Sequence, residues 1–266
     1  MRTALVTGAN DGIGFATAQA LLGKGWRVLV HARSQSKAGQ AVAALANAGG
    51  EAVGVWGDLA ELAQVQALAA QAAAPAPVLD VLINNAGVYE QARAMTRDGF
   101  ERTMGINHFG HLLLTLKLRD ALAKSDQPRV IQVSSGVHLG AKLDLDDLDL
   151  AHGWSGYGAY GASKLANAVT AAELARRPAW KGVMSFSLHP GVVTTKLLTR
   201  NFGTGGIAPA AGARTSVYCA TEAGLEGRNG GYFSDSRAAQ PNPRVLDPAF
   251  GAELWDRSLE RLKKWL

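Results

Sequence analysis

The chain has 266 residues, of which 47% are hydrophobic and 18% are charged, and its formal net charge is +5. This composition fits one folded domain over residues 1–266 and excludes a disordered chain. The basic residues are scattered rather than clustered, and no apolar run reaches the roughly 18 residues that cross a bilayer, so we expect a cytoplasmic protein with no nucleic-acid partner and no membrane span.

Apolar runs rich in Val and Ile alternate along the chain with amphipathic stretches of helical length. In chain order, the pattern predicts a strand at 3–7, helix 12–25, strand 26–32, helix 36–50, strand 51–57, helix 61–77, strand 79–87, helix 100–124, strand 128–135, helix 158–177, strand 182–191, helix 209–222, strand 230–234 and helix 253–266. This alternation predicts an α/β doubly wound Rossmann fold, in which a seven-stranded parallel sheet carries helices on both faces.

A glycine-rich turn, TGANDGIG, stands between the first expected strand and the first expected helix. Gly8, Gly12 and Gly14 let the backbone turn sharply and approach a ligand closely, while the helix directs free N–H groups at an anion. The spacing GxxxGxG differs from the GxGxxG of the commonest dinucleotide fingerprint. The position of the turn nevertheless predicts that it binds the pyrophosphate of a dinucleotide.

The end of the second expected strand bears on the choice of dinucleotide. An acid there would bind the ribose 2′-hydroxyl of NAD, whereas an arginine can pair with a 2′-phosphate. The sequence has Arg33 at this point, with His31 and Lys37 near it. NADP(H) is therefore favoured, with NAD(H) possible if Arg33 only stacks over adenine. Asp11 stands inside the glycine turn, where a basic residue would help to bind the phosphate, and it opposes this interpretation.

Tyr160 and Lys164 occur at positions i and i+4 of an expected helix, so they share one face of it. A neighbouring ammonium group stabilises a phenolate and lowers the pKa of the phenol, which makes Tyr160 a candidate general acid and base. Ser135 ends the fifth expected strand, where open α/β sheets bind their ligands, and it is a candidate donor to a substrate oxygen.

Three other features do not point to a site. His108 and His111 are one helical turn apart, but no third ligand of matching spacing follows, so we expect no metal. The acidic stretch 143–150 lacks the glycine and the glutamate of a calcium loop and is interpreted as a solvated loop. The single Cys219 is interpreted as a small buried side chain.

Six motifs in register resemble the short-chain dehydrogenase/reductase family in its compact single-domain branch. These are TGANDGIG, GDL at 57–59, NNAG at 84–87, VSS at 133–135, YGASK at 160–164 and HPGVVTT at 189–195. The stretches INHFGHLLLT, SSGVHLGAKLDLDDL, SKLANAVTAAELARR and GGYFSDS are similar, more particularly, to the retinol-dehydrogenase and WW-domain-oxidoreductase subgroup.

The resemblance implies a role for four residues. Tyr160 would donate or accept the proton, Lys164 would hold the nicotinamide ribose, Ser135 rather than Ser134 would orient the carbonyl, and Asn107 would support a water-linked proton relay to Lys164. It also implies a set of cofactor-binding residues, which includes Tyr160 and Lys164 together with Gly8, Asn10, Asp11, Gly12, Ile13, Gly14, Arg33, Asp58, Leu59, Asn85, Ala86, Gly87, Pro190, Gly191, Val193 and Thr195.

The implied reaction is hydride transfer between nicotinamide and a carbonyl or alcohol of a small molecule. Loops at 88–95, 136–157 and 196–209 are expected to line an apolar substrate site, in which Leu139, Trp154, Tyr157, Leu197 and Phe202 are candidates. The resemblance further implies a homodimer or homotetramer through the helices at 100–124 and 158–177. Two alternatives stay open, a catalytically silent NADP(H)-binding sensor and nucleotide-sugar epimerase chemistry.

Overall fold

The structure is a computed structural model that describes residues 1–266. One eight-stranded sheet runs through it in the order β3-β2-β1-β4-β5-β6-β7-β8. The strands are β1 (Thr3–Val6), β2 (Arg27–Ala32), β3 (Glu51–Trp56), β4 (Val81–Asn84), β5 (Arg129–Val133), β6 (Met184–His189), β7 (Tyr232–Ser234) and β8 (Arg237–Ala238). The first seven pair in parallel, as predicted, and the two-residue β8 adds an antiparallel edge.

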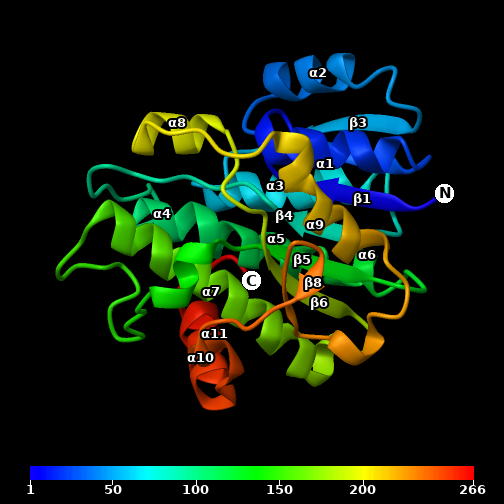
Figure 1. Ribbon diagram of the computed structural model, residues 1–266. Helices are drawn as coiled ribbons and strands as arrows, with labels where there is room; N and C mark the ends of the chain where they lie inside the picture. Colours follow the sequence, from blue (N-terminus) through cyan, green and yellow to red (C-terminus); the bar gives the residue numbers. More distant parts are fainter.

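Helices cover both faces of the sheet, which confirms the doubly wound Rossmann fold (Figure 1). One face carries α1 (Gly12–Leu22), α2 (Gln35–Ala44) and α9 (Pro209–Thr221), and the other carries α3 (Leu62–Ala73), α5 (Gly110–Lys117) and α7 (Gly156–Arg176). The buried apolar side chains accordingly form two clusters, one on each side of the sheet. The strand order reverses between β1 and β4, and such a reversal opens a crevice at the carboxyl ends of the strands.

The expected helix at 100–124 is not continuous. It divides into α4 (Arg102–Met104), a π-helical turn (Gly105–Phe109), α5 and α6 (Arg119–Leu122). Two glycines bracket the π-helical turn because neighbouring segments approach the backbone closely there. A Cβ atom on Gly105 would lie 2.8 Å from Cγ2 of Thr96, and one on Gly110 would lie 2.6 Å from the carbonyl oxygen of Leu59. Neither glycine could therefore carry a larger side chain without a shift of its neighbours.

Two further segments differ from the expected elements. Residues that the sequence assigned to a loop form α8 (Lys196–Phe202), a seven-residue helix that has no buried residue. The last helix, α11 (Pro248–Leu262), begins earlier than expected because Asp247 caps its first turn and Pro248 suits its first position. A short helix, α10 (Pro243–Leu246), precedes it.

The helices expected to form an oligomer interface are buried within the chain itself. All residues of α7 from 161 to 174 are buried, and so are all residues from 103 to 115. Helices α10 and α11 pack beside α7, at the end of the molecule away from α2 (Figure 1). These buried stretches offer little surface to a partner, but Arg119 and Asp120 near the end of the first helix are exposed, so the expectation that these two helices form the interface stays a prediction. The homodimer or homotetramer itself stays a prediction.

The longest helix, α7, has 21 residues and includes polar side chains such as Lys164, Asn167 and Glu173. No helix in the fold combines the length and the apolar character that crossing a bilayer requires. The expected cytoplasmic location stays a prediction.

The glycine turn depends on close backbone packing, and this can be tested by adding single methyl groups. A Cβ atom on Gly14 would lie 2.3 Å from the carbonyl oxygen of Gly8 and 2.5 Å from Nδ2 of Asn85. We expect Gly14→Ala to lower the free energy of unfolding by about 1–3 kcal/mol in urea denaturation, because a well-packed site must shift to accept it.

Gly39 in α2 is the matched control, because nothing lies within 4 Å of an added Cβ atom there. We expect Gly39→Ala to raise the free energy of unfolding by about 0.5–1 kcal/mol, since alanine favours the helix. Equal effects of the two substitutions would contradict the close packing at Gly14.

Candidate active site

A cavity of about 590 Å³ opens at the carboxyl ends of β1, β4, β5 and β6. Every residue predicted to bind the cofactor lines it, from the glycine turn, Arg33, the turns at 58–59 and 85–87, and the segment 190–195. Ser135, Tyr160 and Lys164 line it as well. Of the predicted site residues, only Asn107 lies behind the cavity wall. The sheet therefore brings predicted site residues from distant parts of the chain, such as Gly8 and Thr195, into one cavity.

The glycine turn forms a tight cradle at one end of the cavity. Gly8 and Gly12 have positive φ angles of 63° and 56°, which L residues rarely adopt. Asp11 caps α1 and accepts a hydrogen bond of 2.8 Å from the backbone N–H of Gly12. Because Gly14 also excludes a side chain, the cradle exposes backbone at the start of α1, where the helix dipole attracts an anion. These residues fit the pyrophosphate of a dinucleotide.

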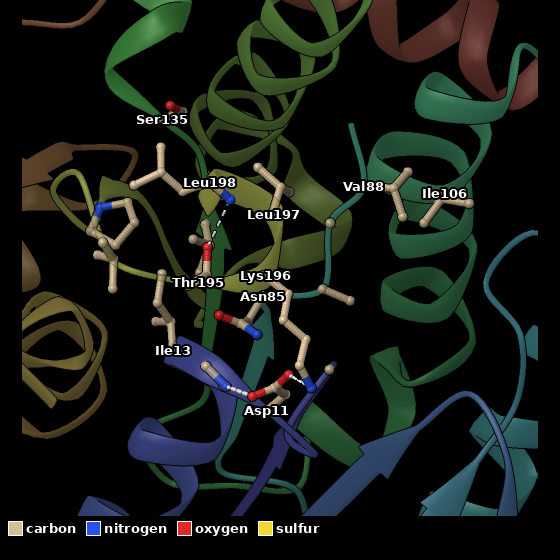
Figure 2. A pocket seen from close by; sticks show the side chains of 18 of the residues that line it. Asp11, Ile13, Asn85, Val88, Ile106, Ser135, Thr195, Lys196, Leu197 and Leu198 are labelled. Carbon is tan, nitrogen blue, oxygen red and sulfur yellow. Dashed lines mark hydrogen bonds and ion pairs between the residues drawn. The ribbon is translucent and has the colours of Figure 1, made fainter. Parts of the chain in front are cut away.

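Asp11 forms an ion pair with Lys196, a residue that was expected only as part of a loop lining the substrate site. Nζ of Lys196, the first residue of α8, lies 2.5 Å from Oδ2 of Asp11. Figure 2 shows the Lys196 side chain extending from α8 to Asp11 at the cavity wall. The hydrogen bond from Lys196 holds the pKa of the Asp11 carboxyl below its usual value. The ion pair reduces the repulsion between Asp11 and a phosphate. In the sequence, only the position of Lys196 directly after the HPGVVTT motif could have indicated that it lies at the cavity.

Three basic side chains lie near the end of β2, but only two of them can carry a charge. Arg33 and Lys37 line the cavity, are exposed and form no ion pair with a carboxylate. His31 is buried, and burial lowers its pKa to about 4, so it is neutral at physiological pH. Its Nε2 donates to the carbonyl oxygen of Gly57 (2.9 Å), and its Nδ1 accepts from the N–H of Gly8 (3.1 Å). His31 is thus part of the scaffold and not a candidate phosphate ligand.

The turn after β4 is held against the glycine turn by Thr7. The Thr7 hydroxyl oxygen accepts hydrogen bonds from the backbone N–H groups of Asn85 (2.8 Å) and Ala86 (2.9 Å). Nδ2 of Asn85 donates to the carbonyl oxygen of Thr7 at 2.7 Å. Ala86 is so close to Gly8 that a Cβ atom on that glycine would lie 3.1 Å from it. The two turns therefore form one continuous wall of the cavity.

Tyr160 and Lys164 lie one turn apart on α7, and Nζ of Lys164 is 5.7 Å from the centre of the Tyr160 ring. Burial raises the pKa of the Tyr160 phenol to about 12, and a hydrogen bond with Ser135 lowers it only in part. Lys164, which was expected to lower the pKa of the phenol, does not do so. The Lys164 ammonium group donates instead to the carbonyl oxygen of Val133 at the end of β5 (2.8 Å).

Lys164 is itself buried, with 3% of its surface exposed, and burial lowers its pKa to about 8. An ammonium group has three N–H donors, so two remain after the hydrogen bond to Val133. A Cβ atom on Gly87 would lie 3.2 Å from Nζ of Lys164 and 3.6 Å from Oδ1 of Asn107. The turn after β4 therefore approaches this ammonium group more closely than a larger residue would allow.

Asn107 belongs to the π-helical turn and is fully buried. Its Oδ1 accepts from the backbone N–H of Val88 (2.8 Å), and its Nδ2 donates to the carbonyl oxygen of Val88 (3.0 Å) and to the hydroxyl of Ser163 (2.9 Å). The side chain thus ties the segment after β4 to α7, next to Lys164. This places Asn107 behind the reacting groups and not among them.

The two serines after β5 have different environments. The Ser134 hydroxyl donates to the backbone oxygen of Lys164 at 2.7 Å and is buried. The Ser135 hydroxyl caps the short 3₁₀ turn at 136–140 and contacts Tyr160. Ser135 is therefore the serine whose hydroxyl is available at the cavity, as the resemblance implied.

The other end of the cavity is mostly apolar. Val88 and Ile106 lie next to each other on one side of it, and Leu197 and Leu198 of α8 lie on another (Figure 2). The remaining side chains at this end are Arg102, Val137, Tyr157, Val192 and Phe202. Tyr157, Leu197 and Phe202 were expected from the sequence, whereas Ile106 and Arg102 were hidden in the expected long helix.

Two candidates for the apolar lining lie elsewhere. Trp154 donates from its indole nitrogen to Oε1 of Glu101 (3.1 Å), and Leu139 is 51% exposed outside the cavity. The sequence does not show which apolar loop residues face the cavity, and in the structure Leu139 and Trp154 do not line it.

A family model described as short chain dehydrogenase matches residues 2–204. The chain is 38% identical over 286 residues to retinol dehydrogenase 14 of Mus musculus. The alignment covers 97% of this chain and 84% of that protein. Its fold is similar to a crystal structure of a Mycobacterium paratuberculosis protein, with a TM-score of 0.81 and 31% identity over 99% of this chain and 94% of that one.

A second similar structure, from Beutenbergia cavernae, contains NADP at low occupancy. It has a TM-score of 0.71 and 25% identity, and the match covers 92% of this chain and 96% of that one. The family match extends over the glycine turn, the Ser135 segment and α7, which are the parts that form the cavity. The chain therefore belongs to the short-chain dehydrogenase family and is an NAD(P)-dependent oxidoreductase.

Proposed function

We propose that the protein reduces the carbonyl group of a small apolar molecule with NADPH, and carries out the reverse oxidation when the cofactor supply favours it. One observation carries the proposal. Ser135, Tyr160 and Lys164 converge on one cavity, at whose opposite end the glycine turn and Arg33 are suited to a phosphorylated dinucleotide. A bound nicotinamide would supply or accept the hydride.

Tyr160 is the proton donor in this proposal. Because burial holds its pKa at about 12, the phenol keeps its proton at neutral pH and is ready to donate it to a carbonyl oxygen that gains negative charge. Ser135, whose side chain acts on the pKa of Tyr160, orients the same oxygen. In the oxidation direction the same group acts as the base, so the phenol must first lose its proton, and the cofactor supply sets the net direction.

Lys164 and Asn107 support these groups. Lys164 has donors left after its bond to Val133 and holds the ribose next to the nicotinamide. Asn107 fixes the segment after β4 against α7, which sets the distance between that segment and the ammonium group. The proton relay implied by the resemblance would pass from Lys164 along this side of the cavity.

NADP(H) is the preferred cofactor in this proposal, because the cations at the end of β2 are unpaired and Asp11 in the glycine turn forms an ion pair with Lys196. Arg33 and Lys37 are free to pair with a 2′-phosphate. Lys196 forms an ion pair with Asp11, which reduces the repulsion between this carboxylate and a phosphate. The apolar end of the cavity favours a carbonyl compound or alcohol with little charge, in line with a relative named for retinol.

The proposal can be tested by incubating the pure protein with NADPH and a panel of aldehydes, ketones and quinones while nicotinamide absorbance is followed. We expect turnover of apolar carbonyl compounds and little turnover of charged ones. Binding of NADPH without turnover of any compound would favour the silent sensor instead. Conversion of an added nucleotide sugar to its epimer, detected by chromatography because it consumes no net NADPH, would favour the epimerase.

Tyr160→Phe removes the proton donor but keeps the ring. We expect kcat to fall about a hundredfold or more, the range typical for loss of a general acid, while the Kd for NADPH changes less than about threefold. Steady-state kinetics and fluorescence titration with NADPH measure the two quantities. Tyr218→Phe, on α9 and packed against Phe233, is the control and should keep full activity. Activity of Tyr160→Phe close to that of the control would refute the assignment.

Arg33→Asp tests the choice of cofactor. We expect kcat/KM with NADPH to fall about tenfold to a hundredfold, because a charge-assisted hydrogen bond is lost and a repulsion is added, while kcat/KM with NADH rises. Lys124→Asp changes the net charge equally at an exposed position outside the cavity and should leave the ratio of the two constants unchanged. The same ratio in both variants would show that Arg33 does not read the 2′-phosphate.

A further inference from the structure

The two histidines of the sequence NHFGH have different partners. His108 and His111 are both buried, with 2% and 1% of their surface exposed. Nε2 of His108 is hydrogen-bonded to the hydroxyl of Ser258 on α11 (3.0 Å), on the side away from the cavity. His111 instead lies between the π-helical turn and the end of β1. No group of three His, Cys, Asp or Glu side chains is arranged to hold a metal ion, so the function of His111 has to be sought in its hydrogen bonds.

The hydrogen bonds of His111 define which nitrogen carries its proton. Nδ1 lies 3.0 Å from the carbonyl oxygen of Asn107, which can only accept, so Nδ1 is the donor. Burial lowers the pKa of His111 to about 3, and the ring is therefore neutral at physiological pH. Nε2 is then an acceptor, and the Thr7 hydroxyl, 2.9 Å away, donates to it.

The Thr7 hydroxyl continues this chain of hydrogen bonds into the cavity wall. Its oxygen accepts from the backbone N–H groups of Asn85 and Ala86, so its single proton must point elsewhere. Nε2 of His111, at 2.9 Å, is the nearer acceptor for that proton, and the carbonyl oxygen of Ile83 is farther away at 3.3 Å. A change at His111 therefore affects how firmly Thr7 holds the turn after β4.

The backbone of His111 is fixed from a third direction. Its carbonyl oxygen accepts from the hydroxyl of Thr115 (2.7 Å), and that hydroxyl accepts from Nδ2 of Asn84 at the end of β4 (2.9 Å). The imidazole ring is thus a rigid spacer between Asn107, which holds the segment next to Lys164, and Thr7, which holds the turn at 85–86.

We propose that His111 is a positioning residue that couples the two halves of the active site: its Nδ1–H fixes the backbone of Asn107 beside Lys164, and its Nε2 fixes Thr7 and with it the cofactor-binding turn at 85–86. The inference rests on the proposed function of the cavity. The bond of His111 to Asn107 is assigned to turnover, and the bond of His111 to Thr7 is assigned to dinucleotide binding.

Two variants separate the two bonds. In His111→Asn, the amide nitrogen stands where Nδ1 stands, so the bond to Asn107 is kept and the bond to Thr7 is lost. In His111→Gln, the amide oxygen stands where Nε2 stands, so the bond to Thr7 is kept and the bond to Asn107 is lost. His111→Leu loses both bonds. Each variant is compared with the wild type by kcat with a carbonyl substrate and by the Kd for NADPH alone, measured by fluorescence titration.

We expect the Asn variant to raise the Kd for NADPH about fivefold or more and to keep kcat within about threefold, since one buried hydrogen bond is left without its acceptor. We expect the Gln variant to lower kcat about fivefold or more and to keep the Kd within about threefold. The Leu variant should show both losses.

His108→Gln is the control, because His108 lies in the π-helical turn three residues before His111, is equally buried and has its own buried hydrogen bond. We expect this variant to lose thermal stability and to keep both kcat and Kd within about twofold. A general loosening of the turn would move kcat and Kd in this variant too, so the control separates positioning from stability.

Parallel changes of kcat and Kd in the Asn and Gln variants, or unchanged values in the Leu variant, would overturn the proposal for His111. A wild-type protein that binds NADPH but turns over no carbonyl compound would overturn the proposed function. The affinities of the Asn and Gln variants would then still decide on His111, because the Thr7 bond acts on dinucleotide binding without chemistry.

Discussion

The buried ammonium group of Lys164 is the constraint around which the site is arranged. A charged group that is removed from water costs several kcal/mol unless it finds partners, and no carboxylate forms an ion pair with this one. Its partner is the carbonyl oxygen of Val133, the last residue of β5. The cost appears as the lowered pKa of the lysine. A dinucleotide ribose beside this group would supply the polar contacts that the protein alone does not.

The fold meets this constraint by making α7 rigid. Its residues from 161 to 174 are buried on every side, between the sheet and helices α10 and α11. Tyr160 and Lys164 therefore keep a fixed distance from each other and from the strand ends, which suits groups that must meet a substrate within a fraction of an ångström. The polar side chains behind them, Asn107 and His111, use all their hydrogen-bonding groups within the protein.

Much of this arrangement could be predicted from the sequence, because strand periodicity and turn glycines are local signals. The order of strands and helices followed from them, and so did the glycine turn, Arg33 and Ser135 at strand ends, whereas most of the other cavity residues came from the resemblance to the family. The pKa of Tyr160 could not be predicted, since burial and the direction of the Lys164 ammonium group depend on distant packing. The ion pair of Asp11 with Lys196 joins residues from opposite ends of the matched region, and neither residue type signals it. The π-helical turn was also missed, because the sequence there has an ordinary helical pattern.

Helix α8 contributes to the cavity without contributing to the core. None of its residues is buried, yet Leu197, Leu198 and Phe202 line the apolar end. Substitutions in this helix can therefore alter the shape offered to a substrate while the stability of the domain hardly changes. Under the proposed function, the side chains that contact the substrate and those that stabilise the domain belong to different elements, so sequence changes in α8 can alter substrate preference without loss of the fold.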